Sequence, residues 1–188
     1  MAPNQKFWAS ATLEPKRAHR WLLSLGPSAL PDYICKRVDK PSFSVGQSEH
    51  MFFGHSFYYP GTVKWQPITV TVVDPIQPDV ATGLYQILKN MGYDTPDNRE
   101  AIANEQNSLG TVSKARATEV FGDTIYLKQF SPINGVDELV EEWSIHNPWI
   151  KDVKFGGLDY GSEAIVDITL TIVYDFAKVD RGPGAKFF

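Results

Sequence analysis

Apolar and polar residues alternate in several segments of the chain, and this pattern predicts β-strands. The clearest case is 165–175, where apolar residues including Ile168, Leu170 and Ile172 share one face and threonines lie on the other. Residues 62–74 alternate in the same way, and Pro60–Gly61 before them is typical of a turn. Further strands are expected at 19–25, about 33–45, 123–130, 139–146 and 149–156.

Near 80–91 the spacing of apolar residues changes from that of a strand to that of an amphipathic α-helix. Asp79 is a good N-cap for this helix and Gly92 a good stop signal. Its apolar stripe consists of Val80, Leu84, Ile87, Leu88 and Met91. The sequence therefore predicts a mainly β fold, a sandwich or barrel of about six to seven mostly antiparallel strands with this one flanking helix. The expected core includes Trp143, Ile168, Leu170, Ile172, Leu84 and Leu88.

No linker or repeat divides the chain, so residues 1–188 are interpreted as a single domain. Residues 1–16 are polar and irregular and are expected to form a flexible N-terminal arm. Residues 93–122 are weakly patterned and are expected to form a long loop with a short helix near Asn98–Asn107. Residues 176–188 are expected to form a loose C-terminal tail.

Composition narrows the possible functions. The chain is 43% apolar with a net charge of −4, which is typical of a globular protein and argues against a dedicated nucleic-acid binder. The acidic excess lies in the second half, where residues 96–188 hold fifteen acidic and nine basic side chains. The apolar runs are too short for a membrane span, and the N-terminus has no secretion-signal pattern.

Candidate catalytic and metal-binding residues form no convincing set. His50 and His55 would point to opposite faces of a single strand, as would Glu141 and Glu142. Cys35 is the only cysteine. The neighbouring Lys36 and Arg37 would favour a lowered thiol pKa, but a lone buried cysteine is the simpler interpretation. We expect no enzyme activity, no metal and no cofactor.

Aromatic side chains are concentrated in 49–65, where the only lysine or arginine is Lys64. The shortage of positive charge disfavours single-stranded nucleic acid as the ligand. Aromatic residues are enriched at the centres of protein interfaces. The residues expected at a subunit interface are therefore Phe52, Phe53, Phe57, Tyr58, Tyr59 and Trp65, although Trp65 fits a core position equally well.

Three stretches together carry a family resemblance. The first is Ala-Leu-Pro at 29–31, followed by the extended segment 35–43; the second is Phe-Tyr-Tyr-Pro-Gly-Thr-Val-Lys-Trp at 57–65, followed by the strand 68–73 and a helix. The third runs from Glu-Trp-Ser-Ile-His-Asn-Pro-Trp-Ile-Lys at 142–151 through 153–160 to 168–175. Their order and spacing over about 19–176 resemble the tail tube proteins of contractile-tailed bacteriophages. Residues 93–122 look like an insertion relative to shorter members.

The resemblance implies a structural virion protein with no catalytic residues. Its fold would be shared with type VI secretion and other contractile injection system tubes. Six copies would form a ring, and rings would stack into a tube inside a contractile sheath. The implied partners are other copies of the chain, the tail sheath protein, baseplate and tail-terminator proteins, and the tape-measure protein and phage DNA in the lumen. The implied location is the virion tail, assembled in the host bacterial cytoplasm.

Two alternatives stay open at this level. One is a tube-like baseplate or tail-terminator protein, which forms a single ring. The other is a β-sandwich carbohydrate-binding module, in which Trp8, Trp149 or the aromatic residues at 57–59 would provide a binding platform.

Overall fold

The computed structural model describes residues 16–26, 30–93, 111–133 and 136–181. These residues form ten β-strands, two α-helices and one short 3-10 helix. The strands are β1 (Trp21–Ser24), β2 (Cys35–Val38), β3 (Ser42–Phe52), β4 (His55–Gln66), β5 (Ile68–Val73), β6 (Thr124–Ile133), β7 (Val136–His146), β8 (Trp149–Lys154), β9 (Asp167–Val173) and β10 (Phe176–Arg181). The helices are η2 (Asp32–Ile34), α1 (Val80–Asn90) and α3 (Lys114–Phe121).

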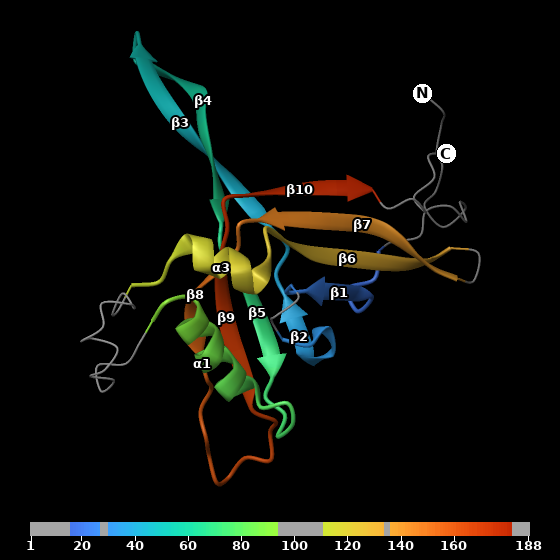
Figure 1. Ribbon diagram of the computed structural model, residues 1–188. Helices are drawn as coiled ribbons and strands as arrows, with labels where there is room; N and C mark the ends of the chain where they lie inside the picture. Colours follow the sequence, from blue (N-terminus) through green and yellow to red (C-terminus); the bar gives the residue numbers. More distant parts are fainter. Residues whose placement is uncertain (1–15, 27–29, 94–110, 134–135, 182–188) are drawn as a thin grey trace.

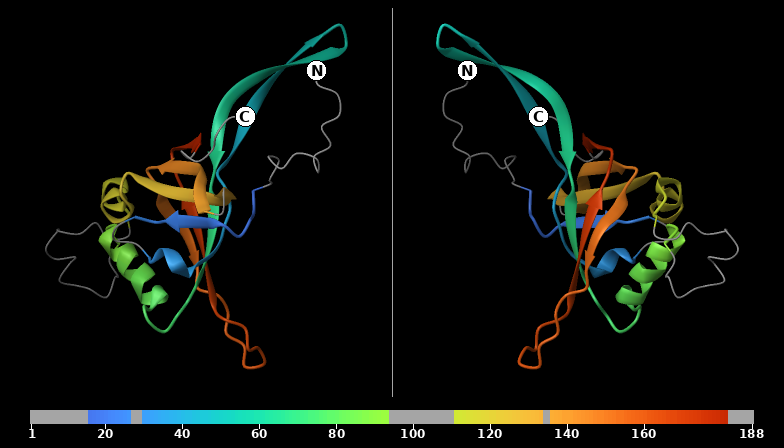
Figure 2. Two further views of the ribbon diagram at one scale, coloured as in Figure 1. Left: turned by 90° about the vertical axis from the view of Figure 1, so that its right-hand side faces the viewer. Right: turned by 90° about the vertical axis from the view of Figure 1, so that its left-hand side faces the viewer.

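Two four-stranded antiparallel sheets form the body of the molecule. The first sheet has the strand order β1-β6-β7-β10, and the second has the order β2-β5-β9-β8. Figure 1 shows the strands of one sheet running across those of the other. Among the described strands, β3 and β4 pair only with each other, and they leave the body as a long ribbon (Figures 1 and 2).

The two sheets and both helices share one hydrophobic core. Alternate residues of β5 and β9 point into it, and the pairs Ile68–Ile172 and Val70–Leu170 lie opposite each other in the register. Of the residues expected in the core, Ile168, Leu170, Ile172 and Leu84 are buried, while Leu88 and Trp143 are half-buried and pack against it. The core therefore fixes how the two sheets are positioned relative to each other.

The helix α1 forms where the sequence pattern places it. The Asp79 side chain accepts a hydrogen bond from the backbone N–H of Thr82 at 3.0 Å and caps the first turn. Gly92 follows the helix with φ of +113°, a conformation that favours glycine. Four residues of the apolar stripe are buried in the shared core, and Leu88 packs against it half-buried; the four are Val80, Leu84, Ile87 and Met91.

The mainly β fold with a flanking helix is confirmed, but several details of the sequence prediction were wrong. The described residues hold ten strands rather than six or seven. A second helix, α3, lies at the end of the segment 93–122. Residues 176–181 form the paired strand β10 rather than a loose tail. The helix expected near 98–107, the arm up to residue 15 and residues 182–188 lie outside the described residues.

Two leucines give a matched test of this core. Leu170 is 1% exposed at the centre of β9, whereas Leu158 is 90% exposed in the connection between β8 and β9. We expect Leu170→Ala to lower the free energy of unfolding by about 2–5 kcal/mol, because the cavity it leaves cannot close fully. Leu158→Ala should change it by less than about 0.5 kcal/mol. Urea denaturation of both variants checks this, and equal effects would contradict the packing described.

Candidate functional site

The β3–β4 ribbon is the most unusual feature of the molecule. Its register runs from the pair Ser42–Gln66 at the root to the pair Phe52–His55 at the tip. An eleven-residue strand such as β3 spans roughly 36 Å at about 3.3 Å per residue. The tip residues Phe53 and Gly54 both have positive φ, 48° and 78°, as a tight two-residue hairpin turn requires. Most of the ribbon therefore extends beyond the body, as Figure 2 shows.

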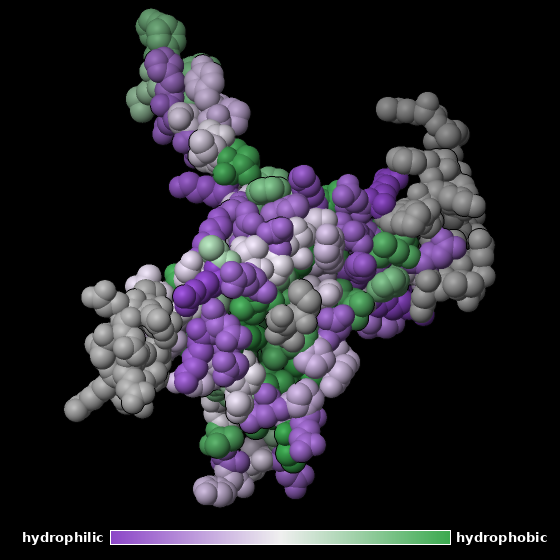
Figure 3. Space-filling view, viewed as in Figure 1, coloured by the Kyte–Doolittle hydropathy of each residue, from purple (hydrophilic) through white to green (hydrophobic). Residues whose placement is uncertain are grey.

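The outer half of the ribbon exposes aromatic side chains on both faces. The register places Phe52, Phe57 and Tyr59 on one face and Tyr58 on the other. All four are exposed, and Phe53 at the tip is 85% exposed. The rings of Phe52 and Phe53 make an edge-to-face contact with centroids 4.5 Å apart. Figure 3 shows apolar atoms at the end of this projection. Five of the six residues expected at an interface therefore lie together on one exposed element.

Trp65, the sixth, lies at the root of the ribbon instead. It is half-buried against the core, with its ring centroid 5.4 Å from that of Phe43 and 6.0 Å from that of Tyr174. The Pro60–Gly61 turn expected between these residues and the tip is wrong, because β4 continues through both. The register shifts there, and a Cβ on Gly61 would lie 3.1 Å from the carbonyl oxygen of Gly46. The two residues mark a β-bulge rather than a turn.

The hairpin also corrects the expectation for the two histidines. His50 pairs with Phe57 across the ribbon, and His55 pairs with Phe52. Because the chain turns between the histidines, both lie on the same face as Phe52 and Phe57, not on opposite faces of one strand. No group of three His, Cys, Asp or Glu side chains suited to a metal ion occurs among the described residues.

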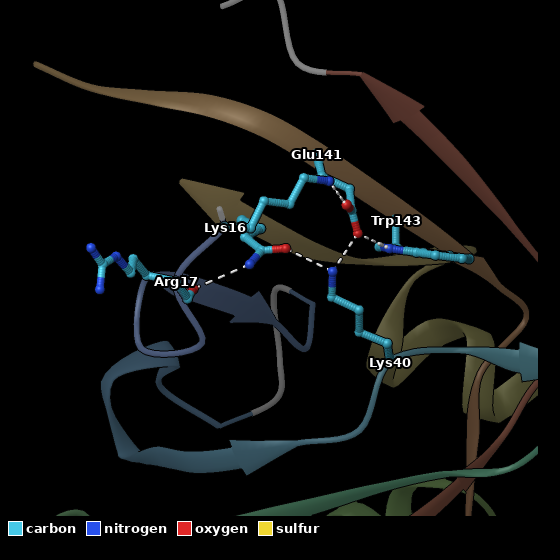
Figure 4. A network of polar contacts seen from close by, with 6 residues as sticks. Lys16, Arg17, Lys40, Glu141 and Trp143 are labelled. Carbon is cyan, nitrogen blue, oxygen red and sulfur yellow. Dashed lines mark hydrogen bonds and ion pairs between the residues drawn. The ribbon is translucent and has the colours of Figure 1, made fainter. Parts of the chain in front are cut away.

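A polar network fixes the root of the ribbon to the first sheet (Figure 4). Lys40, two residues before β3, donates from Nζ to Glu141 Oε1 at 2.6 Å and to Gln129 Oε1 at 2.7 Å. Trp143 Nε1 donates to Glu141 Oε1 at 2.6 Å, and Lys16 forms an ion pair with the same carboxylate. Glu141, which lies in β7, thus links that strand to the segment before β1 and to the segment before β3.

The charge of Glu141 is stabilised by these contacts. Burial alone would raise the pKa of its carboxyl group, but the hydrogen bonds from Lys16, Lys40 and Trp143 outweigh burial and lower the pKa to about 2. Glu142, next in sequence, lies on the opposite face and contacts Lys128 at 3.5 Å. The two carboxylates therefore do not form an acid/base pair, and the network has a structural role.

Cys35 is not an activated thiol. Burial and the nearby negative charge of Asp32 raise its pKa to about 11. The lowering expected from Lys36 and Arg37 is wrong, because both of those side chains are exposed while the thiol is half-buried. A protonated thiol is a poor nucleophile, so Cys35 behaves as a small packing residue.

Comparison with known proteins decides the fold. No protein-family model and no curated protein sequence matches the chain. A chain of the six-fold symmetrised baseplate of the anti-feeding prophage is similar in structure, with a TM-score of 0.58 and 14% identity over 88% of this chain and 95% of that one. The chain has the contractile tail tube fold.

Two further structures have this tube fold. One chain comes from the tube-terminating cap of the anti-feeding prophage, with a TM-score of 0.56 and 16% identity over 92% of this chain and 95% of that one. Another comes from the sheath/tube terminator of the extracellular contractile injection system PVC in its extended state. Its TM-score is 0.55, with 18% identity over 90% of this chain and 99% of that one. Within the described part of this chain, no helix has the length and apolarity needed to cross a membrane.

The Glu141 network predicts a pH-dependent stability. Because the pKa of Glu141 in the fold is about 2 and its ordinary value is 4.5, the stabilisation is complete above about pH 4.5 and is lost as the pH falls towards 2. We expect Glu141→Gln to lower the free energy of unfolding by about 2 kcal/mol at pH 7. The difference from the unmodified protein should shrink steadily below pH 4.5.

The matched control is Glu142→Gln, since its ion pair with Lys128 is partly open to solvent and contributes only about 0–1 kcal/mol. Urea denaturation of the three proteins between pH 2 and pH 7 provides the measurement. A difference between Glu141→Gln and the unmodified protein that stays constant over this range would show that the carboxylate charge does not stabilise the fold.

Proposed function

We propose that this chain is a structural subunit that forms hexameric rings, and that the rings stack into the inner tube of a contractile tail. The observation that carries the proposal is the exposed aromatic ribbon on a body with the tube fold. Among the described residues, nothing in the body covers either outer face of the ribbon, so we infer that another molecule buries it. The six-fold symmetry of the anti-feeding prophage baseplate supports the ring number.

The sheets provide a second means of association. Within the described residues, each sheet ends in two strands with an unpaired side, β1 and β10 in the first sheet and β2 and β8 in the second. Such edges pair readily with strands of another copy. A ring of identical subunits needs two different surfaces on each copy, and edges on opposite sides of a sheet meet that need.

The proposal extends to the partners that a tail tube would have. These are the sheath protein outside the tube, baseplate and tail-terminator proteins at its ends, and the tape-measure protein and phage DNA in the lumen. The acidic second half of the sequence suits a lumen through which DNA slides during ejection, because like charges repel phosphates. We assign the protein no catalytic role, and place it in the virion tail after assembly in the bacterial cytoplasm.

A second candidate function is a ring that ends a tube rather than extending it. The similarity to chains from a tube-terminating cap and from a sheath/tube terminator favours it. Such a protein would form isolated rings at concentrations at which a tube protein forms long filaments.

Negative-stain electron microscopy of the purified protein over a concentration series tests both functions. We expect hollow tubes of stacked rings at high concentration; rings that never stack would favour the terminator, and particles that stay monomeric would contradict the proposal.

The ribbon should be necessary for this assembly. We expect Phe53→Asp to leave the fold intact, because the side chain is 85% exposed, and to reduce tube number at least tenfold by placing a charge in the buried contact. Tyr33→Asp, at an exposed aromatic residue in η2, should form tubes normally. Counting tubes on micrographs and comparing circular dichroism spectra checks both variants. Normal tubes from Phe53→Asp would remove the ribbon tip from the assembly contacts.

A further inference from the structure

A hollow of about 180 Å³ lies beside the polar network, between the first sheet and the end of β2. The strand register brings its walls together. Trp21 of β1 pairs with Gln129 of β6, and Leu127 of β6 pairs with Trp143 of β7, so all four side chains share one face of the first sheet. Val38 of β2 lines the opposite side. The hollow is therefore built by both sheets, at the border of the shared core.

The walls of this hollow suit an apolar side chain. Trp21, Val38 and Trp143 pack against the core but are only half-buried. The two polar residues of the lining, Lys40 and Gln129, are already hydrogen-bonded to each other at 2.7 Å, so neither needs a ligand. An apolar cavity of about 150 Å³ is enough to hold a benzene-sized group. The hollow is therefore about the size of one leucine or phenyl side chain.

The segment before β1 runs along the rim of the hollow (Figure 4). Lys16 forms an ion pair with Glu141, and the carbonyl of Arg17 accepts a hydrogen bond from Gln129 Nε2 at 3.2 Å. Ala18 is itself part of the lining. The described chain therefore begins at the mouth of the hollow and is held there by polar contacts on both of its first two residues.

We propose that this hollow is the docking site of the preceding segment of the same chain, residues 1–15, and that the Leu13 side chain fills it. Leu13 is the nearest large apolar residue before Lys16, only three positions away, whereas the aromatic residues Phe7 and Trp8 lie eight or more positions away. Three residues span at most about 10 Å, so Leu13 stays within reach of the rim from which the chain departs. The inference concerns a single chain and does not depend on the proposed function.

Docking of Leu13 would connect the start of the chain to the root of the ribbon. The side chain would cover the apolar parts of Trp21 and Trp143 and keep water from one side of Lys40, which lines the hollow. The contact between Lys40 Nζ and Glu141 Oε1, at 2.6 Å, becomes stronger as water is excluded from it. Since Lys40 lies two residues before β3, the docked segment would help to hold the ribbon in place.

Leu13→Ala tests whether this leucine is buried. Urea denaturation of the dilute full chain should show an equilibrium constant for unfolding raised at least about tenfold, because the substitution leaves part of the hollow unfilled. The matched control is Leu158→Ala, the same change at a side chain that is 90% exposed, which should alter that constant less than about threefold. An effect of Leu13→Ala as small as that of the control would overturn the inference.

Disulfide trapping shows where Leu13 packs. Leu13→Cys is combined with Val38→Cys, or with Leu158→Cys as the control pair, and Cys35→Ala in both proteins leaves only the two introduced thiols. A disulfide needs the two Cβ atoms within about 3.5–4.5 Å. We expect mild oxidation to link the first pair within one chain at least about tenfold more than the second, as measured by free-thiol titration and non-reducing electrophoresis.

The two remaining outcomes both count against the inference. Equal yields from the two pairs would show that Leu13 does not reach the hollow, even if Leu13→Ala destabilises the fold. Disulfide-linked dimers from the first pair in place of linked monomers would show that the segment of another copy occupies the hollow.

Discussion

The rest of this structure depends on one constraint, a two-stranded ribbon that pairs with no other strand in the described part of the chain. Such a ribbon is marginally stable in water on its own, because no third strand or core covers its faces. The β3–β4 ribbon nevertheless places aromatic side chains on both faces and at its tip. This exposed aromatic surface contributes to stability only when another molecule buries it. The body therefore has a complete core of its own, whereas the ribbon leaves apolar surface uncovered.

Contacts with the body fix the position of the root of the ribbon. Trp65 packs between Phe43 and Tyr174 on one side, and Lys40 ties the approach to β3 to Glu141 and Gln129 of the first sheet. A fixed root sets the direction of the ribbon, so less conformational entropy is lost when the tip binds. The charged network therefore helps to set the direction of the ribbon, although it lies far from the tip.

Features that depend on a local sequence pattern were predicted correctly, whereas features that depend on pairing between distant strands were not. The alternation around Ile168 and Leu170 and the cap at Asp79 are local, and both were predicted from the sequence. The tail strand β10 was missed because its ordering comes from pairing with β7, which no short pattern shows. Pro60–Gly61 resembles a turn locally, yet the true turn is at Phe53–Gly54, where an aromatic residue occupies a position that usually favours asparagine.

The magnitude of a single tip contact explains why assembly would start from rings rather than from pairs of subunits. An aromatic side chain buries about 150–250 Å², which gives about 4–6 kcal/mol at about 25 cal/mol per Å². Association of two molecules costs at least about 4 kcal/mol in lost translational and rotational freedom, so a single tip contact is close to balanced. When one hexameric ring associates with another, this loss of freedom occurs once while six tip contacts form together. Stacking of rings is therefore strongly cooperative. A preformed ring would therefore bind the next ring. Free subunits would not associate through the tip contact until a ring is present.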